Sequence, residues 1–134
     1  MNRVVDHVGL RVTDYSRARS FYNTALGTLG IRLLADFEVA GKRHAGYGRA
    51  DDEHATFWID EGKQFRGEAH VAFTANSRAE VEAFYSAALS NGGRDNGPPG
   101  LRPEYHPDYY GAYVLDPDGH NVEAVYIGPA GGRT

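Results

Sequence analysis

Glu123 is the residue whose position in the sequence most clearly requires a chemical partner. It lies in an apolar run that ends at Ile127 and predicts a strand. In a strand, Glu123 shares one face with Val125, so that face carries a carboxylate beside an apolar side chain. Burial of an unpaired carboxylate is so unfavourable that the acid either finds a partner or stays protonated. The rest of the chain must therefore supply a partner for Glu123.

An internal repeat places two histidines at equivalent positions. When the sequence is shifted so that His7 falls on His70, the aromatic pairs at 21–22 and 84–85 align without a gap. Matches of aromatic residues at helical spacing are common, but a repeated histidine at one strand position is more specific. A repeat of this kind indicates two copies of one structural unit.

Each copy is expected to contain one strand, one helix and three further strands. For the first copy we predict a strand over 4–12, a helix over 16–26 capped by Thr13 or Asp14, and strands over 32–40, 43–49 and 54–60. For the second we predict a helix over 78–90 capped by Asn76 or Ser77, a surface loop at 97–100, and strands over 109–115 and 121–127. The copies, about 3–62 and 66–128, form one domain spanning 1–134, and they should pair within one chain or across a dimer because each exposes an apolar sheet face alone.

Composition narrows the class of protein. The chain has 134 residues, 41% of them apolar and 24% charged, as in ordinary globular proteins. A formal net charge of −4 and the lack of a basic run argue against a nucleic-acid partner, and no apolar run is long enough to span a membrane. The absence of cysteine excludes disulfides and thiolate metal sites and fits a reducing compartment. We therefore expect a cytoplasmic protein.

The chain resembles the vicinal oxygen chelate superfamily over about residues 3–127. The resemblance lies in the opening DHVGLRVTDYSRARSFY and the closing DPDGHNVEAVY. Members of this superfamily include glyoxalase I, extradiol dioxygenases, fosfomycin-resistance proteins and bleomycin-binding proteins. The resemblance implies an α+β fold in which two βαβββ modules form a curved mixed sheet.

The resemblance also implies a metal site made by His7, His70 and Glu123. The fourth position of glyoxalase I falls within 56–58, where this sequence has no carboxylate, so three ligands are expected. Two imidazoles and one carboxylate suit a divalent ion such as Fe, Mn, Ni, Co or Zn, with open positions for substrate oxygens. Such an ion would also be the partner that Glu123 needs.

Further candidates surround these positions. As catalytic residues beside Glu123 we consider Tyr113, which matches a Tyr of the dioxygenases, and His106, a possible general acid or base that is equally well a loop residue. As substrate-binding residues we consider Trp58, Tyr47, Arg102 and Tyr105, for each of which core packing or plain surface exposure is the alternative. We expect His44 in the same wall as Tyr47, His54 and His120 to face solvent, and Asp116 and Asp118 to cap backbone donors in a turn.

Two functions remain in competition. The first is a metal-dependent lyase or dioxygenase that chelates adjacent oxygens of a small organic substrate, acting as a homodimer. The second is a metal-free protein of the same fold that binds a drug or metabolite, with a pocket rich in Trp and Tyr. The two hypotheses are distinguished by whether the purified protein contains a bound divalent metal.

Overall fold

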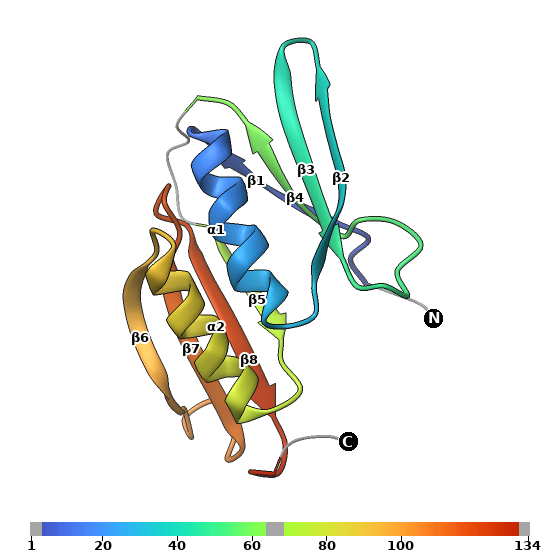
Figure 1. The fold of residues 1–134 in the computed structure, drawn as a ribbon. Coiled ribbons are helices and arrows are strands. Elements are labelled where there is room, and N and C mark those ends of the chain that lie inside the picture. The colour runs from blue at the N-terminus through green and yellow to red at the C-terminus, as the bar shows by residue number, and fades with distance from the viewer. Residues whose placement is uncertain (1–3, 64–68, 132–134) are drawn as a thin grey trace.

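Two similar modules lie side by side in the computed structural model, which describes residues 4–63 and 69–131 (Figure 1). The first consists of β1 (Val8–Val12), α1 (Tyr15–Gly27), β2 (Arg32–Val39), β3 (Lys42–Gly48) and β4 (Phe57–Glu61). The second consists of β5 (His70–Thr74), α2 (Arg78–Ser90), β6 (Arg94–Leu101), β7 (Tyr109–Leu115) and β8 (Asn121–Ile127). The predicted α+β fold of two βαβββ modules is confirmed.

The sheets of the two modules have the same topology. In the described residues the strand orders are β1-β4-β3-β2 and β5-β8-β7-β6, and in each sheet the first pairing is parallel and the others are antiparallel. The ends of α2, β7 and β8 fall at the predicted bounds, whereas β1 begins at Val8 and β4 at Phe57, later than predicted. The repeat in the sequence thus corresponds to a repeat in the fold.

The prediction of a surface loop at 97–100 was wrong. These residues belong to β6, whose ladder with β7 shifts register between Asp95 and Gly97 and again between Gly97 and Gly100. Proline is tolerated in a strand at the edge of a sheet or at a bulge, because there its missing N–H leaves no partner unpaired. β6 occupies such an edge, which accounts for the two prolines between the glycines.

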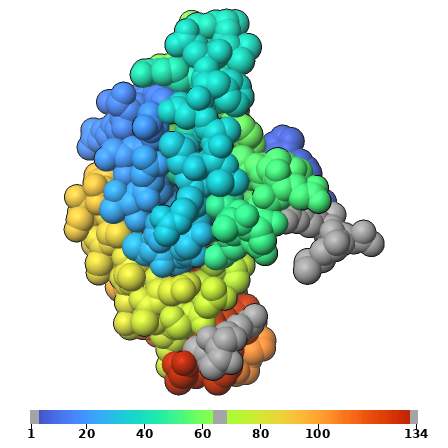
Figure 2. All heavy atoms as spheres, turned by 45° about the vertical axis from the view of Figure 1, so that its right-hand side comes forward, coloured from blue at the N-terminus to red at the C-terminus, as the bar shows by residue number. Residues whose placement is uncertain are grey.

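Local signals in the sequence account for the helix starts and one turn. The side chains of Asp14 and Ser77 accept hydrogen bonds from the third backbone N–H of α1 and α2, each at 3.1 Å, as N-caps do. Ala40 and Gly41 connect β2 to β3 with φ angles of 53° and 79°. Two successive residues with positive φ match the right-handed twist of a hairpin. This hairpin projects beyond the rest of the molecule in Figures 1 and 2.

The two faces of each sheet differ in character. Both helices lie on the same side of the sheets and contact each other (Figure 1), and the core fills the space between helices and sheets. In β8, Val122, Ala124 and Tyr126 are fully buried on this helix-facing side. Side chains that alternate with them, Glu123 among them, point to the opposite face, which we call the open face. The open faces therefore carry the polar side chains, such as Glu123, that could bind a ligand or take part in a reaction.

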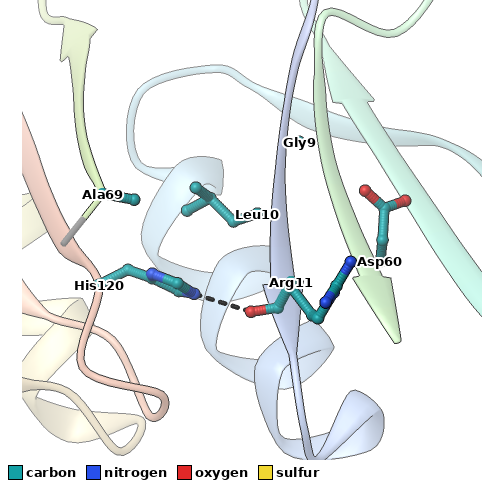
Figure 3. Close-up of a pocket in the computed structure, with 6 residues that line it drawn as sticks. All are labelled: Gly9, Leu10, Arg11, Asp60, Ala69 and His120. Carbon is teal, nitrogen blue, oxygen red and sulfur yellow. Dashed lines mark hydrogen bonds between the residues drawn. The ribbon is translucent and has the colours of Figure 1, made fainter. Parts of the chain in front are cut away.

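Hydrogen bonds made by side chains join the modules within one chain. The Tyr22 hydroxyl donates to Asp116 at 2.7 Å, and His120 Nε2 lies 2.7 Å from the Arg11 carbonyl oxygen (Figure 3). Asp116 also accepts backbone N–H bonds within its turn, the capping role predicted for it. The expectation that His120 faces solvent was wrong, because its side chain is 7% exposed and bridges to β1. No helix in the described part of the chain is long and apolar enough to cross a membrane.

Candidate functional site

Glu123 has two side-chain partners on the open face of the second sheet. Its side chain is 1% exposed, Oε1 lies 2.7 Å from His70 Nε2, and Oε2 accepts a hydrogen bond from the Tyr109 hydroxyl. β5 runs parallel to β8, with His70 opposite Asn121, and this register brings the imidazole over the carboxylate. The two groups answer the demand that a buried acid makes for hydrogen-bond partners.

Tyr109 is a partner of Glu123 that the sequence analysis did not assign. Strand alternation puts Tyr109, Gly111 and Tyr113 on one face of β7, and this was the signal that could have found it. A Cβ atom at Gly111 would lie 3.1 Å from the Tyr109 ring and 3.3 Å from Glu123 Oε2, so the glycine leaves room for this contact. Burial and the bond to the Glu123 carboxylate raise the pKa of Tyr109. The phenol therefore stays protonated at neutral pH and acts as a donor.

Tyr113 lies beside this pair, in the place where the sequence predicted a site residue. It is the cross-strand neighbour of Glu123, and its ring centroid lies 6.1 Å from that of His70. Burial and the negative charge of Glu123 raise the pKa of Tyr113. The Arg102 guanidinium lies 5.4 Å from the centre of the Tyr113 ring and donates to the Pro98 carbonyl oxygen at 2.6 Å. Arg102 thus borders the site.

The other two candidates from the same segment lie further out. Tyr105 is 66% exposed, and its ring packs against Tyr109 with centroids 5.2 Å apart. His106 is exposed, and its Nδ1 accepts a hydrogen bond from the Asp108 backbone N–H at 2.9 Å. That bond places the proton of a neutral His106 on Nε2. Its role as an acid or base stays a prediction.

His7 lies apart from the His70–Glu123 pair within one chain. It is exposed, its Nδ1 lies 2.8 Å from Asp6, and His54 Nε2 contacts the same carboxylate at 3.0 Å. Among residues 4–63 and 69–131, no three His, Cys, Asp or Glu side chains come close enough together to hold a metal ion. One chain therefore brings two of the three predicted ligands together.

The pair that is brought together has donors suited to a divalent metal. Two ligands at about 2.1 Å from a metal and at right angles are separated by about 3 Å. The 2.7 Å between His70 Nε2 and Glu123 Oε1 is close to this spacing. The imidazole ring is half-exposed while the carboxylate is buried, so one side of the pair is open to a ligand. Imidazole nitrogen and carboxylate oxygen both bind borderline divalent ions, and the pair fits such an ion.

The residues predicted as a pocket wall in the first module divide between its two faces. Trp58 is half-buried on the open face, where its ring packs edge-on to Phe37 with centroids 5.6 Å apart. Tyr47 points the other way: it is fully buried, and its hydroxyl donates to Asn23 of α1 at 2.9 Å. We correct its assignment to the wall, because it is a core residue of the helix-facing side. His44, expected in the same wall, does share the face of Trp58.

Two βαβββ modules of equal topology, each with one open sheet face, define a protein of the glyoxalase-like fold. The model of the Glyoxalase/Bleomycin resistance protein/Dioxygenase superfamily matches residues 4–124, and the chain belongs to this family. The resemblance found in the sequence is thereby confirmed.

Solved structures agree with this assignment. A glyoxalase/bleomycin resistance protein from Albidiferax ferrireducens is 28% identical, with 94% of this chain and all of that chain covered and a TM-score of 0.73. Glyoxalase I from Zea mays is 30% identical with a TM-score of 0.68; the match covers 90% of this chain but 45% of the maize chain. A glyoxylase/bleomycin resistance protein/dioxygenase domain from Frankia shares the fold at 17% identity, with 96% and 100% covered and a TM-score of 0.70. No curated protein matches the chain.

Proposed function

We propose that this protein is a metal-dependent enzyme that acts on a small oxygenated organic molecule. The observation that carries the proposal is the buried Glu123 carboxylate, which pairs with the half-exposed His70 imidazole at 2.7 Å. These two residues would hold a divalent ion of the Fe, Mn, Ni, Co or Zn type. Such an ion, when bound, supplies Lewis acidity toward adjacent substrate oxygens.

The surrounding residues have roles that follow from their contacts. The Tyr109 hydroxyl donates to Glu123 Oε2 and so fixes the carboxylate with Oε1 turned toward His70. Because its pKa is raised by burial and by that bond, Tyr109 holds its proton at neutral pH. Tyr113, on the same face, would bind a substrate oxygen, and Arg102 above its ring would attract an anionic substrate group.

His7 enters the proposed site from a second copy of the chain. It lies before β1, and in its own chain it pairs with Asp6 rather than with Glu123. The open face of the first module exposes Phe37 at 45%, and the projecting hairpin also exposes Leu34 and Val39. A homodimer that places the first module of one copy over the second module of the other would cover these side chains and bring His7 to the pair.

Metal binding at defined stoichiometry tests the proposal. The protein is freed of metal with a chelator and titrated with Ni²⁺, Zn²⁺ and Mn²⁺ by calorimetry, and the protein purified without chelator is analysed for its elements. We expect one ion per chain, and a loss of affinity of at least tenfold in His70→Ala and Glu123→Gln. His54→Ala, which removes an exposed histidine outside the pair, is the matched control. Equal binding in all four proteins would refute the site.

The competing function is that of a metal-free protein that binds a drug or metabolite. The observation that favours it is the aromatic surface of the open faces, where Phe37 and Trp58 lie on one sheet and Tyr109 and Tyr113 on the other. Activity toward a panel of catechols and hemithioacetals, gained with metal and lost in Glu123→Gln, would decide for the enzyme. Ligand binding that ignores both metal and Glu123→Gln would decide for the binding protein.

A further inference from the structure

Two asparagine–glycine pairs lie near each other in the sequence, at 91–92 and 96–97. Asparagine is a thermolabile residue, because the backbone nitrogen of the next residue can attack its side-chain amide carbon and expel ammonia. Glycine as the next residue has no side chain to hinder the attack and lets the backbone rotate freely. In an unfolded chain the two pairs would therefore react alike. The fold holds them in different ways.

The first pair is held by the end of α2. Asn91 is the C-cap of this helix: its backbone N–H donates to the Ala88 carbonyl oxygen at 3.2 Å, and its Nδ2 donates to the Ala87 carbonyl oxygen at 3.0 Å. The side chain is half-buried. Attack by the Gly92 nitrogen needs the Asn91 amide group to turn toward it, and this would first break the bond to the helix. The fold therefore restrains this pair.

The second pair lies at an irregular point of an edge strand. Asp95 pairs with Val114 and Gly97 with Tyr113, so within these two strands no residue of β7 lies opposite Asn96. A residue that the ladder leaves unpaired in this way is the extra residue of a β-bulge. β6 is also the outer strand of its sheet (Figure 1), and Asn96 is exposed. The ladder therefore does not restrain the backbone of this asparagine.

Exposed side chains bind both reacting groups of the second pair. The Asn96 Nδ2 atom donates to Asn121 Oδ1 at 3.2 Å, and the Gly97 N–H donates to Asp95 Oδ1 at 2.9 Å. Because both hydrogen bonds are exposed, water can replace either acceptor at little cost in free energy. The Asn96 amide carbon and the Gly97 nitrogen can therefore approach each other while the rest of the fold stays intact.

Gly97 also packs closely against residues of the candidate site. Its φ angle is 148°, and a Cβ atom there would lie 2.8 Å from the Tyr113 side chain and 3.3 Å from the Arg102 guanidinium. Arg102 in turn donates to the Pro98 carbonyl oxygen at 2.6 Å. The backbone that follows Asn96 thus fits against two side chains of the site, and a change in its length would displace them.

We propose that Asn96 is a site of spontaneous modification in the folded protein, where it converts to isoaspartate and aspartate while Asn91 is protected. Hydroxide removes the Gly97 N–H proton, and the nitrogen forms a bond to Asn96 Cγ. The Cγ–Nδ2 bond breaks, and the amide group takes a proton from water and leaves as ammonia. Water then opens the cyclic imide at either of its carbonyl carbons. The net reaction consumes one water and releases one ammonia, and it is independent of the metal proposed at the His70–Glu123 pair.

Isoaspartate changes the second module in two ways. It carries the main chain through the former side chain, which adds one methylene between residues 96 and 97, so Gly97 loses its fit against Tyr113. Either product also adds a negative charge near Asn121, the residue opposite His70 in the register of β5 and β8. The modification would therefore change the surroundings of the candidate site as the protein ages.

Mass spectrometry of the aged protein tests the proposal. The native protein and the protein unfolded in guanidinium chloride are incubated at mildly alkaline pH, and trypsin then cuts at Arg94, which puts the two pairs on separate peptides. In the unfolded protein we expect equal rates at Asn91 and Asn96. In the native protein Asn96 should react within about twofold of its unfolded rate and Asn91 about tenfold more slowly, the factor that corresponds to a restraint of about 1.4 kcal/mol. Equal protection of the two residues in the native protein would overturn the proposal.

Variants assign the product to one residue. Asn96→Gln, whose longer side chain closes the ring far more slowly, should remove most isoaspartate formation in the native protein. Asn91→Gln is the matched control and should leave it unchanged. The assay is methyl transfer from S-adenosylmethionine by an isoaspartate-specific methyltransferase, which does not recognise aspartate. Equal isoaspartate in Asn96→Gln and in the wild-type protein would refute the assignment to Asn96.

The ring-proton NMR resonances of Tyr113 report the structural consequence. They should shift during incubation of the wild-type protein, in proportion to the isoaspartate formed, and stay in place in Asn96→Gln. If they stay in place in the fully modified protein, Gly97 has kept its position and the proposed effect on the site fails. These measurements are made on the chain without added metal, so failure here is distinguishable from failure of the metal site.

Discussion

Replacement of Tyr109 by Phe tests whether the phenol holds Glu123 in place. The Glu123 side chain is 1% exposed, and its Oε2 accepts the Tyr109 hydroxyl while Oε1 contacts His70. The variant keeps the ring and removes only the donor, so a buried carboxylate oxygen loses its partner. Hydrogen bonds to charged groups contribute about 1.5–3 kcal/mol to stability. Tyr109 is half-buried, so water reaches the vacated position in part, and we expect a loss of about 1–2 kcal/mol.

Denaturation by urea at neutral pH, followed by circular dichroism, measures this loss. Tyr105→Phe is the matched control, because Tyr105 is 66% exposed and contacts Tyr109 through its ring. We expect a change within about 0.5 kcal/mol for the control, as for most surface substitutions. If Tyr109→Phe and Tyr105→Phe behave alike, the hydroxyl of Tyr109 does not support the buried acid.

The same variant has a pH signature whose sign follows from the pKa shift. Burial and the Glu123 carboxylate raise the pKa of Tyr109 above its ordinary value of 10.0. A group whose pKa is raised on folding adds stability that is fully present below the unfolded pKa and is lost as pH rises above it. The stability difference between wild type and Tyr109→Phe should therefore stay constant from neutral pH to about pH 9 and shrink above about pH 10. A difference that grows with alkaline pH would contradict the contact.

Two further substitutions test close packing elsewhere. Gly46→Ala should destabilise the fold by about 1–3 kcal/mol and shift the fluorescence spectrum of Trp58, because a Cβ atom would lie 2.7 Å from the indole ring. Gly27→Ala, where a Cβ atom meets nothing within 4 Å, should be neutral or stabilising in the same assays. His120→Ala should cost about 1–3 kcal/mol in urea denaturation, because it removes a side chain that is 7% exposed and its bond to β1. His54→Ala is the control: this side chain is 54% exposed, and its loss should change stability by less than about 0.5 kcal/mol. Equal losses of stability for the two variants would show that the hydrogen bond between His120 and Arg11 contributes nothing.

The fold was predictable because local signals and the repeat agreed. Helix caps at Asp14 and Ser77, helical spacing of aromatics and alternation in β8 all act over a few residues, and each was confirmed in the structure. The error at 97–100 came from the general rule that prolines exclude regular structure. An edge strand with register shifts escapes that rule, and a single sequence does not show which strand lies at an edge.

Strand alternation predicts the face of the sheet on which each candidate side chain lies, and it predicts no more of the site than that. Alternation places Glu123 on the open face, and the resemblance to the superfamily implies His70 as its neighbour. The contact between Tyr109 and Glu123 depends instead on the register between β7 and β8 and on the space left by Gly111. Both are features of the folded structure that local sequence patterns do not show. Within one chain His7 pairs with Asp6 and lies apart from Glu123, and neither alternation nor the repeat shows this distance. The first-module counterpart of Glu123 is Trp58, as β1 and β5 pair with β4 and β8 in equivalent registers. One module therefore carries an indole where the other carries an acid, so equivalent positions on the two open faces differ in chemistry.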